Sequence, residues 1–408
     1  TFKSYSAIDS YGYLYANPFD PLNITSNLLV SSDDDETGIG DQFSMSYPLE
    51  AGANYNLIFT TFDRSLTGRF FIVVSGPARV ILRSMNTTLN QSSTTTSTTV
   101  ATPGVTIPAN AKWSQNGVTV AGGNGGGNAT NQLDWPRGLF VDDDQTVVIA
   151  DTENGRIVQW KDGDTTNGQV VADGNGEGNG LHQLNYPIDV LNDKETDSLI
   201  ICDQGNRRVV RWSRRSGTTQ GEILIDNIDC WGLAMDEQRN LYVSDVVKHE
   251  VRRYRLVEMN GTLVAGGNGK GDGLSQLNFP AYLFVDRQQN VYVSDKWNNR
   301  VMKWNKGAKE GVVVAGGQGY ENALTQLSFP NGIFVDTLGT LYVADTLNHR
   351  VMRWTQGDNK QGTVIVGGNG YGAGPNQLSF PFGLSFDRHG NLYVANWSDH
   401  RVQRFSIE

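Results

Sequence analysis

Cysteine and positive charge are scarce in this sequence. The 408 residues include two cysteines, which excludes a fold built on disulfides and any cysteine-rich zinc module. Charged residues make up 19% and the formal net charge is −10, so the chain lacks the basic surface that recruits nucleic-acid phosphates. No apolar run approaches the roughly 18 residues of a membrane helix. We therefore expect no nucleic-acid partner and no membrane span.

Glycine, in contrast, is abundant, and its 47 residues indicate many turns. The chain begins at Thr1 without a methionine, which fits a processed product or a fragment. At two to three times the length of a typical domain, the chain is too long for one compact core unless its architecture is repetitive.

One unit recurs six times after residue 110, in steps of 42 to 52 residues. Its clearest copy covers residues 326–368. Each copy holds four short β-branched or aromatic runs separated by turn residues, which predicts a four-stranded antiparallel propeller blade. The second run ends in an aspartate, followed after five residues by arginine, except at Glu250, and after nine by an aromatic residue. The aspartate position holds Asp151, Asp203, Asp245, Asp295, Asp345 and Asn396.

The fourth-strand motif also occurs before the first copy, at residues 117–123, whereas the last copy ends after three strands. This arrangement predicts a 3+1 closure, in which the early strand completes the sixth blade and removes two exposed sheet edges. The predicted fold is all-β, with a six-bladed β-propeller over residues 111–408.

The pattern Pro-x-Gly, an apolar run ending in Asp, and Tyr-Val-Ala-Asp-x-x-Asn-x-Arg-Val resembles the NHL repeat of six-bladed propellers over about residues 112–408. Blade three departs most, because Cys230 stands where Pro330 stands in blade five. Cys202 precedes the aspartate of blade two, on the face where the inner strand of blade three begins. We therefore predict a disulfide between Cys202 and Cys230.

The N-terminal region has a different character. Residues 1–84 contain alternating apolar runs without a helical period, which predicts a small β-sandwich. Residues 47–57 resemble the core of pre-peptidase C-terminal domains, which implies an accessory binding or assembly module. Residues 85–110 form a Thr/Ser-rich linker for which we expect O-linked sugars. The expected positions are Ser92, Ser93, Thr94, Thr95, Thr96, Ser97, Thr98 and Thr99.

Further modification and ion sites are suggested by short motifs. Asn-x-Ser/Thr sequons predict N-linked glycans, and we expect Asn396 alone to be bare, because it occupies the aspartate position of its repeat. The other sequons lie at Asn23, Asn86, Asn90, Asn128 and Asn260. The acidic run Asp33, Asp34 and Asp35 is either a solvated loop or a calcium loop, and its oxygen ligands lack a recognisable spacing. No cofactor other than covalent glycans is expected.

Where the repeats stop agreeing, folding no longer fixes the residue type. The first two residues of each inner strand, after the proline or its equivalent, diverge in this way. They supply a candidate ligand pocket at the mouth of the channel, with a solvated rim as the alternative. The candidates are Arg137, Asp189, Trp231, Tyr282, Asn331 and Phe382.

Two metal sites of related propellers are poorly reproduced. Paraoxonase-like and gluconolactonase-like enzymes hold calcium in the channel with a Glu/Asn/Asp set, which one Asp and one Asn do not match. The amidating lyase, which has an NHL-like propeller, binds zinc through converging histidines. Here His249, His349 and His400 share one repeat position on the hairpin turns, where we expect them not to converge. The sixfold Asp/Arg pair is expected to be structural, because a catalytic group is needed only once.

These features favour a secreted, extracellular, non-enzymatic glycoprotein that acts as a structural or adhesive scaffold. Self-association through the N-terminal domain is expected, with extracellular protein or glycan as further partners. Two alternatives stay open: a lyase or lactonase with metal in the channel, and a recognition module for peptide or glycan. The sequence does not identify the ligand, the organism or the geometry of assembly.

Overall fold

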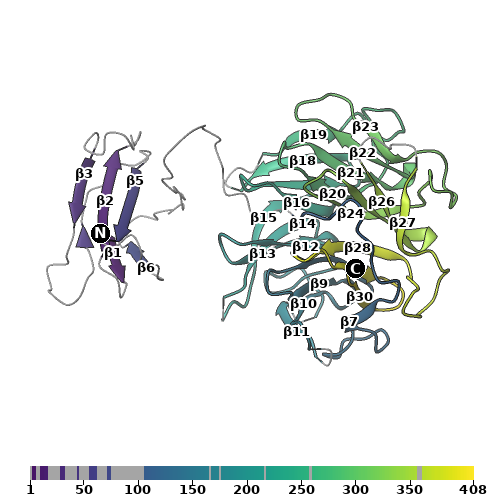
Figure 1. Cartoon of the computed structure of the whole chain (residues 1–408), viewed down its shortest axis with the longest axis horizontal. Coiled ribbons are helices and arrows are strands. Elements are labelled where there is room, and N and C mark those ends of the chain that lie inside the picture. Colours follow the sequence, from purple (N-terminus) through teal and green to yellow (C-terminus); the bar gives the residue numbers. More distant parts are fainter. Residues whose placement is uncertain are drawn as a thin grey trace. The chain divides into compact units, whose positions relative to one another are not determined.

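The computed structural model describes residues 105–408 except 165–166, 174–175, 216, 257–259 and 356–360, together with the backbone of six strands in residues 1–104 (Figure 1). The chain divides into two compact units, Thr1–Thr95 and Thr96–Glu408. Among the described residues, no helix has the length and apolar character to cross a membrane.

The first unit contains two three-stranded sheets, with strand orders β4-β1-β6 and β3-β2-β5. Their strands are β1 Phe2–Tyr5, β2 Ser10–Ala16, β3 Leu28–Ser32, β4 Ser44–Met45, β5 Tyr55–Thr61 and β6 Phe71–Val74. The side chains of this unit lie outside the described residues, so the sandwich stays a prediction. The same holds for Asp33, Asp34, Asp35, for the sequons Asn23, Asn86 and Asn90, and for the O-glycosylation segment from Ser92 to Thr99.

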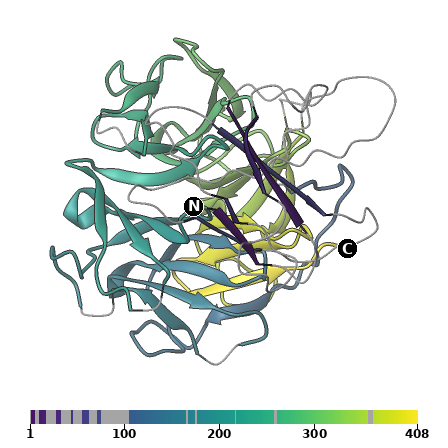
Figure 2. The ribbon, with the colours of Figure 1, turned by 90° about the vertical axis from the view of Figure 1, so that its left-hand side faces the viewer.

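The second unit is a six-bladed β-propeller, which confirms the architecture predicted from the repeat (Figures 1 and 2). Each blade is a four-stranded antiparallel sheet. Blade one comprises β8 Pro136–Val141, β9 Val147–Asp151, β10 Arg156–Trp160 and β11 Gln169–Ala172. Blade two comprises β12 Pro187–Asp193, β13 Ser198–Asp203, β14 Arg208–Ser213 and β15 Glu222–Asp226. Blade three comprises β16 Cys230–Met235, β17 Asn240–Asp245, β18 Glu250–Arg255 and β19 Thr262–Gly266.

Blades four to six complete the ring. Blade four comprises β20 Pro280–Val285, β21 Val291–Asp295, β22 Arg300–Trp304 and β23 Val312–Gly316. Blade five comprises β24 Pro330–Val335, β25 Leu341–Asp345, β26 Arg350–Trp354 and β27 Thr363–Gly367. Blade six comprises β28 Pro381–Phe386, β29 Leu392–Asn396, β30 Arg401–Phe405 and β7 Val118–Gly122. Short 3-10 turns follow the second strand of four blades: η1 Thr152–Asn154, η2 Gln204–Asn206, η3 Lys296–Asn298 and η4 Thr346–Asn348.

The first strand of every blade faces the axis. These six strands contact one another in the cyclic order β8-β12-β16-β20-β24-β28, and β28 contacts β8 again. Their second residue after the proline position is glycine in four blades, because neighbouring backbones approach closely there. A Cβ on Gly383 would lie 2.3 Å from the carbonyl oxygen of Arg137. Asp189 in blade two and Tyr282 in blade four occupy this position instead of glycine. Among the six inner strands, these two residues therefore carry the side chains at this level.

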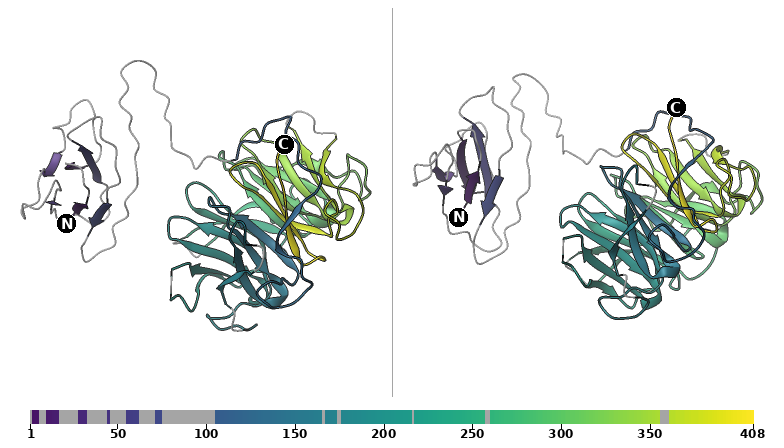
Figure 3. Two further views of the ribbon diagram at one scale, coloured as in Figure 1. Left: turned by 60° about the horizontal axis from the view of Figure 1, so that its bottom comes forward. Right: turned by 90° about the horizontal axis from the view of Figure 1, so that it is seen from below.

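The ends of the propeller chain meet in the sixth sheet, where β7 pairs with β30 in the register Arg401↔Gly122. The blue start of the propeller and its yellow last strands therefore lie together (Figure 3). The residues before β7 also pack on the propeller: Ile107 is fully buried, and the indole of Trp113 donates to the carbonyl of Gly390 at 2.9 Å. The last six residues of the predicted linker, 105–110, thus belong to the propeller rather than to the linker.

The predicted disulfide is confirmed. Cys202 of β13 and Cys230 of β16 are bonded, both are fully buried, and they tie blade two to blade three. The bond lies where the chain enters blade three without the glycine-rich crossover of the other blades.

The repeated Asp/Arg pairs hold each blade to its preceding crossover, as a structural role requires. Asp345 accepts hydrogen bonds from the Ser328 amide at 2.6 Å and from Arg350 Nε at 2.7 Å. The two terminal nitrogens of Arg350 donate to carbonyl oxygens of the crossover, at Asn322, Ala323 and Gln326. The same arrangement recurs at Asp151, Asp203 and Asp295. Blade three differs, because Glu250 pairs with Arg252 at 2.6 Å instead.

Candidate functional site

Four of the six predicted pocket residues meet at the start of the inner strands. The guanidinium carbon of Arg137, on β8, lies 5.2 Å from the ring centres of both Trp231 and Phe382. Tyr282, on β20, packs in one buried cluster with Phe382, against Trp231. Together with Tyr186, Phe279 and Lys296, these four residues form what we call the channel mouth.

Tyr282 reaches across the start of the inner strands. Its side chain starts from blade four, and its hydroxyl donates to the carbonyl of Ile188 in blade two at 3.5 Å, across the front of blade three. Burial raises the pKa of the Tyr282 phenol well above its usual range. A neutral aromatic side chain therefore joins blade four to blade two at the start of the inner strands.

Asp189, the fifth predicted residue, lies near the Tyr282 side chain. One carboxylate oxygen accepts the Leu233 amide at 2.9 Å and the other accepts the Val190 amide at 3.0 Å. Burial raises the pKa of Asp189 to about 7, although both backbone hydrogen bonds act in the opposite direction. Both oxygens are thus engaged by amides, and the bond from Leu233 joins blade two to blade three.

Asn331, the sixth predicted residue, is not part of the cluster. Its amide nitrogen donates to Thr346 Oγ1 at 2.8 Å, within its own blade. The Asn331 side chain is fully buried and its Oδ1 atom has no hydrogen-bond partner. Its contacts are those of a residue that braces the turn after β25.

Lys296 is the functional residue that sequence reasoning missed. It begins η3 in blade four, and its Nζ lies 5.0 Å from the ring centre of Trp231 and 5.3 Å from that of Phe382. The rings of Phe279 and Phe329 lie 5.3 Å and 6.0 Å away. Burial and, to a smaller extent, the nearby charge of Arg137 lower the pKa of Lys296 to about 7. The signal was present, because the position directly after the repeated aspartate also diverges: Thr152, Gln204, Val246, Lys296, Thr346 and Trp397.

The two cations of the channel mouth are poorly balanced by negative charge. Arg137 donates to the Tyr186 hydroxyl at 2.5 Å, while its Nε and a second terminal nitrogen are buried without partners. Within residues 105–408 as described, no carboxylate is within ion-pair distance of Arg137 or Lys296. Glu153, on η1, is the acidic group whose field reaches Arg137 and Tyr186. A desolvated guanidinium with unused N–H groups favours an anionic acceptor.

These residues do not fit a calcium ion. Calcium takes six to eight oxygen ligands, most of them from carboxylates and carbonyls. Both oxygens of Asp189 are already bound by amides, and Arg137 and Lys296 place positive charge at the channel mouth. No group of three His, Cys, Asp or Glu residues with metal-binding geometry occurs in the described part of the chain.

The three histidines at one repeat position serve the crossovers between blades. Nδ1 of His249 accepts the Phe279 amide at 3.2 Å, and Nδ1 of His349 accepts the Phe380 amide at 3.3 Å. His400 accepts the Trp135 amide in the same way at 3.4 Å. Burial lowers the pKa of His249 and of His349, which keeps Nδ1 as an acceptor. They do not converge on one point, so they offer no zinc site.

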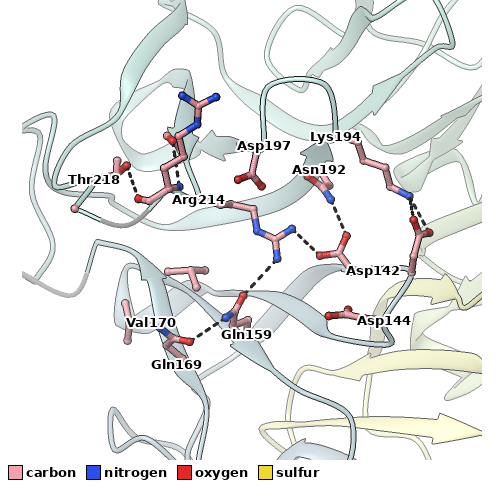
Figure 4. A pocket seen from close by; sticks show the side chains of 15 residues that line it. Asp142, Asp144, Gln159, Gln169, Val170, Asn192, Lys194, Asp197, Arg214 and Thr218 are labelled. Carbon is pink, nitrogen blue, oxygen red and sulfur yellow. Dashed lines mark hydrogen bonds and ion pairs between the residues drawn. The ribbon is translucent and has the colours of Figure 1, made fainter. Parts of the chain in front are cut away.

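A hollow lies between blades one and two, with a volume of about 730 Å³ (Figure 4). It begins beyond the end of β8, so it lies at the opposite end of the inner strand from Arg137. Arg214 pairs with Asp142 at 2.6 Å, and Lys194 pairs with Asp143 at 2.8 Å. Arg214 and Lys194 are thus paired with carboxylates, and Asp144, Asp197 and Arg215 also line the hollow.

The predicted sequons in the propeller differ in access. Asn128 and Asn260 are exposed, which leaves room for a glycan. Asn396 is fully buried, accepts the Ser379 amide at 3.0 Å and donates to Gln403 at 3.0 Å.

Comparison with known proteins shows a family match and a shared fold for the propeller. The family model of the SMP-30/Gluconolactonase/LRE-like region matches residues 190–408. No curated protein matches the sequence. A Bacteroides thetaiotaomicron protein of unknown function is 16% identical, with a TM-score of 0.59 over 97% of this chain and 90% of its own.

Two further solved structures from the same organism are similar. A putative phosphatase is 16% identical, with a TM-score of 0.56 over 73% of this chain and 79% of its own. An auxiliary nutrient binding protein is 14% identical, with a TM-score of 0.54 over 75% of each chain. At these identities the likeness shows a shared fold.

Proposed function

The chain belongs to the SMP-30/gluconolactonase/LRE-like family, and from that premise we propose that it is a ligand-binding propeller whose channel mouth takes a small organic anion with a flat apolar body. The anionic group would lie against Arg137, and the apolar body against the rings of Trp231 and Phe382. The sequence left a recognition module for peptide or glycan as an alternative, and this proposal keeps the module but replaces that ligand class with a small organic anion.

One observation carries the proposal: Arg137 is 5% exposed and keeps two N–H-bearing nitrogens without partners. A buried polar group left unpaired costs about 1–3 kcal/mol, and more when it is charged. At this repeat position a charged side chain occurs in blade one alone, and the other five blades hold an uncharged residue. A carboxylate would supply the missing acceptors, and the aromatic walls would exclude water from the contact.

The other functional expectations stay proposals of lower support. An extracellular location agrees with the Cys202–Cys230 disulfide, because disulfides persist in oxidising compartments. Self-association and adhesion rest on residues 1–84, whose side chains lie outside the described residues. The family match also suggests a lactonase or lyase activity. Such an activity would need reacting groups other than the Glu/Asn/Asp calcium ligands of gluconolactonase-like enzymes.

Isothermal titration with benzoate tests the binding proposal on the whole chain. Benzoate should bind, while benzylammonium, which has the same ring and the opposite charge, should not. Arg137→Gln should weaken benzoate binding by about 10- to 100-fold, the value of a charge-assisted hydrogen bond. Lys270→Gln is the matched control, because Lys270 is exposed and lies over the single ring of Trp297. Equal binding of both probes, or an unchanged affinity in Arg137→Gln, would refute the proposal.

A further inference from the structure

Lys296 has an environment unlike that of a lysine that merely carries surface charge. Four aromatic rings surround its Nζ at 5.0–6.0 Å, and it has neither an ion-pair partner nor a hydrogen-bond partner for its Nζ among the described residues. The side chain is half-buried, so a small molecule entering the channel mouth can reach the amine. Burial and a neighbouring cation favour a neutral, nucleophilic lysine amine, and they act here against the ring faces, which favour the ammonium form.

Arg137 is that neighbouring cation. Arg137 and Lys296 both lie over Trp231 and Phe382, so the two cationic side chains share the same two rings. They are not equivalent, because the guanidinium stays charged while burial and Arg137 lower the pKa of Lys296 to about 7. The channel mouth therefore combines a fixed positive charge with an amine that is half neutral near pH 7.

We infer that Lys296 is a reactive lysine, which condenses reversibly with the carbonyl carbon of a ligand whose anionic group is held by Arg137. This inference rests on the proposed function and names its ligand class: an aldehyde or ketone that also bears a carboxylate. The rings of Trp231 and Phe382 hold the body of the ligand between the two groups.

The condensation is balanced without any further reactant. The neutral Nζ of Lys296 adds to the carbonyl carbon, and the carbonyl π electrons move to oxygen, which takes up a proton. Loss of water from this carbinolamine then breaks the C–O bond and forms a C=N double bond. The atoms of one amine and one carbonyl thus become one imine and one water molecule, with no change in oxidation state.

Trapping with 4-formylbenzoate tests the inference on the whole chain. This probe carries a carboxylate for Arg137, a flat ring and an aldehyde. With cyanoborohydride at pH 7, the imine is reduced to a stable amine that peptide mass mapping locates. We expect Lys296 to be modified at least tenfold faster than Lys270, the exposed lysine on a single ring, and added benzoate to slow the labelling of Lys296 alone.

The variant Lys296→Arg separates this inference from the proposed function. It keeps the positive charge but cannot form an imine, so it should lose the fast adduct, whereas benzoate binding is measured on the native protein. If benzoate binds the native protein and Lys296 is labelled no faster than Lys270, the reactive lysine is wrong and the binding site stands. If benzoate does not bind and Lys296 shows no preference, both fail. The variant Lys270→Arg should keep both the binding and the adduct.

Discussion

Arg350 and Arg137 are both buried arginines, but their partners differ. Arg350 is paired with Asp345 and donates to three crossover carbonyls, so all its polar atoms contribute to holding blade five together. Arg137 has one neutral partner and two unpartnered nitrogens. A buried charge that is fully paired stabilises a fold, whereas one left unpaired is a cost that ligand binding can relieve.

The substitution Arg350→Ala is expected to lower the free energy of unfolding by about 3–5 kcal/mol. It leaves the buried carboxylate of Asp345 without its cation and orphans three carbonyl oxygens. Chemical denaturation measures the change. Lys194→Ala is the control, because Lys194 and its partner Asp143 are both exposed, so its loss should cost about 1 kcal/mol or less. Similar losses in both variants would show that the crossover contacts contribute little.

The substitution Lys296→Met is expected to stabilise the protein in a pH-dependent way. Burial lowers the pKa of Lys296 from 10.5 to about 7, so the charged form is disfavoured in the folded state. The penalty is fully present below pH 7 and disappears as the pH rises toward the unfolded value. The free energy of unfolding of the variant should therefore rise by about 1–3 kcal/mol at pH 6 and by little at pH 10. This range is reduced because Lys296 is partly exposed to solvent. Lys270→Met should show no such trend, and a gain in Lys296→Met that is equal at both values would contradict the assignment.

The channel mouth could be predicted only in part from the sequence. Arg137, Trp231, Tyr282 and Phe382 were found because they break an otherwise regular repeat. Asn331 also departs from the repeat, but its side chain bonds within its own blade. Divergence in the sequence does not determine whether a side chain turns toward its own blade or toward the channel mouth. Lys296 lies on a different element, and its distance to Trp231 depends on how two blades meet, which no spacing along the chain records.

At the scale of elements, the period of the repeat was sufficient to predict the four strands of every blade. Alternating apolar residues fix which face of a strand is buried, and the recurring glycine and aspartate turns fix where it ends. The segment 105–110 was assigned to the linker because it lacks such a pattern. Ile107 is nevertheless fully buried against the propeller, and a single apolar residue in an irregular segment gives no periodic signal.

Removing the disulfide between blades two and three should destabilise the propeller without unfolding it. The bond closes a loop with a sequence separation of 28, which corresponds to about 3–4 kcal/mol in the chain-entropy estimate. The double variant Cys202→Ala with Cys230→Ala should lose about that much on denaturation. The native protein in reductant is the control, because its thiols keep the side-chain volume. Alkylation of two free thiols in the non-reduced protein would show that the bond is absent in solution.

At the scale of the whole propeller, the exposed sheet edges are regularly interrupted. The pairing of the third with the fourth strand shifts register once in every blade, as between Ile157 and Val158 in blade one and between Val402 and Gln403 in blade six. Such irregularities twist an edge strand and hinder its pairing with another chain. Because β7 pairs with β30, the meeting point of the two chain ends adds no unpaired strand.

The propeller alone is therefore expected to be a monomer, and any self-association is expected to need residues 1–84. Light scattering on the whole chain and on residues 105–408 tests this. The shorter chain must begin at Val105, because a start at residue 111 would remove the buried Ile107 and the hydrogen bond between Thr106 and Thr337. We expect a monomer for residues 105–408 and a larger species for the whole chain, since open sheets in the first unit offer edges that a neighbour can complete. Two monomers at high concentration would rule out self-association, and assembly of the shorter chain would move the interface onto the propeller.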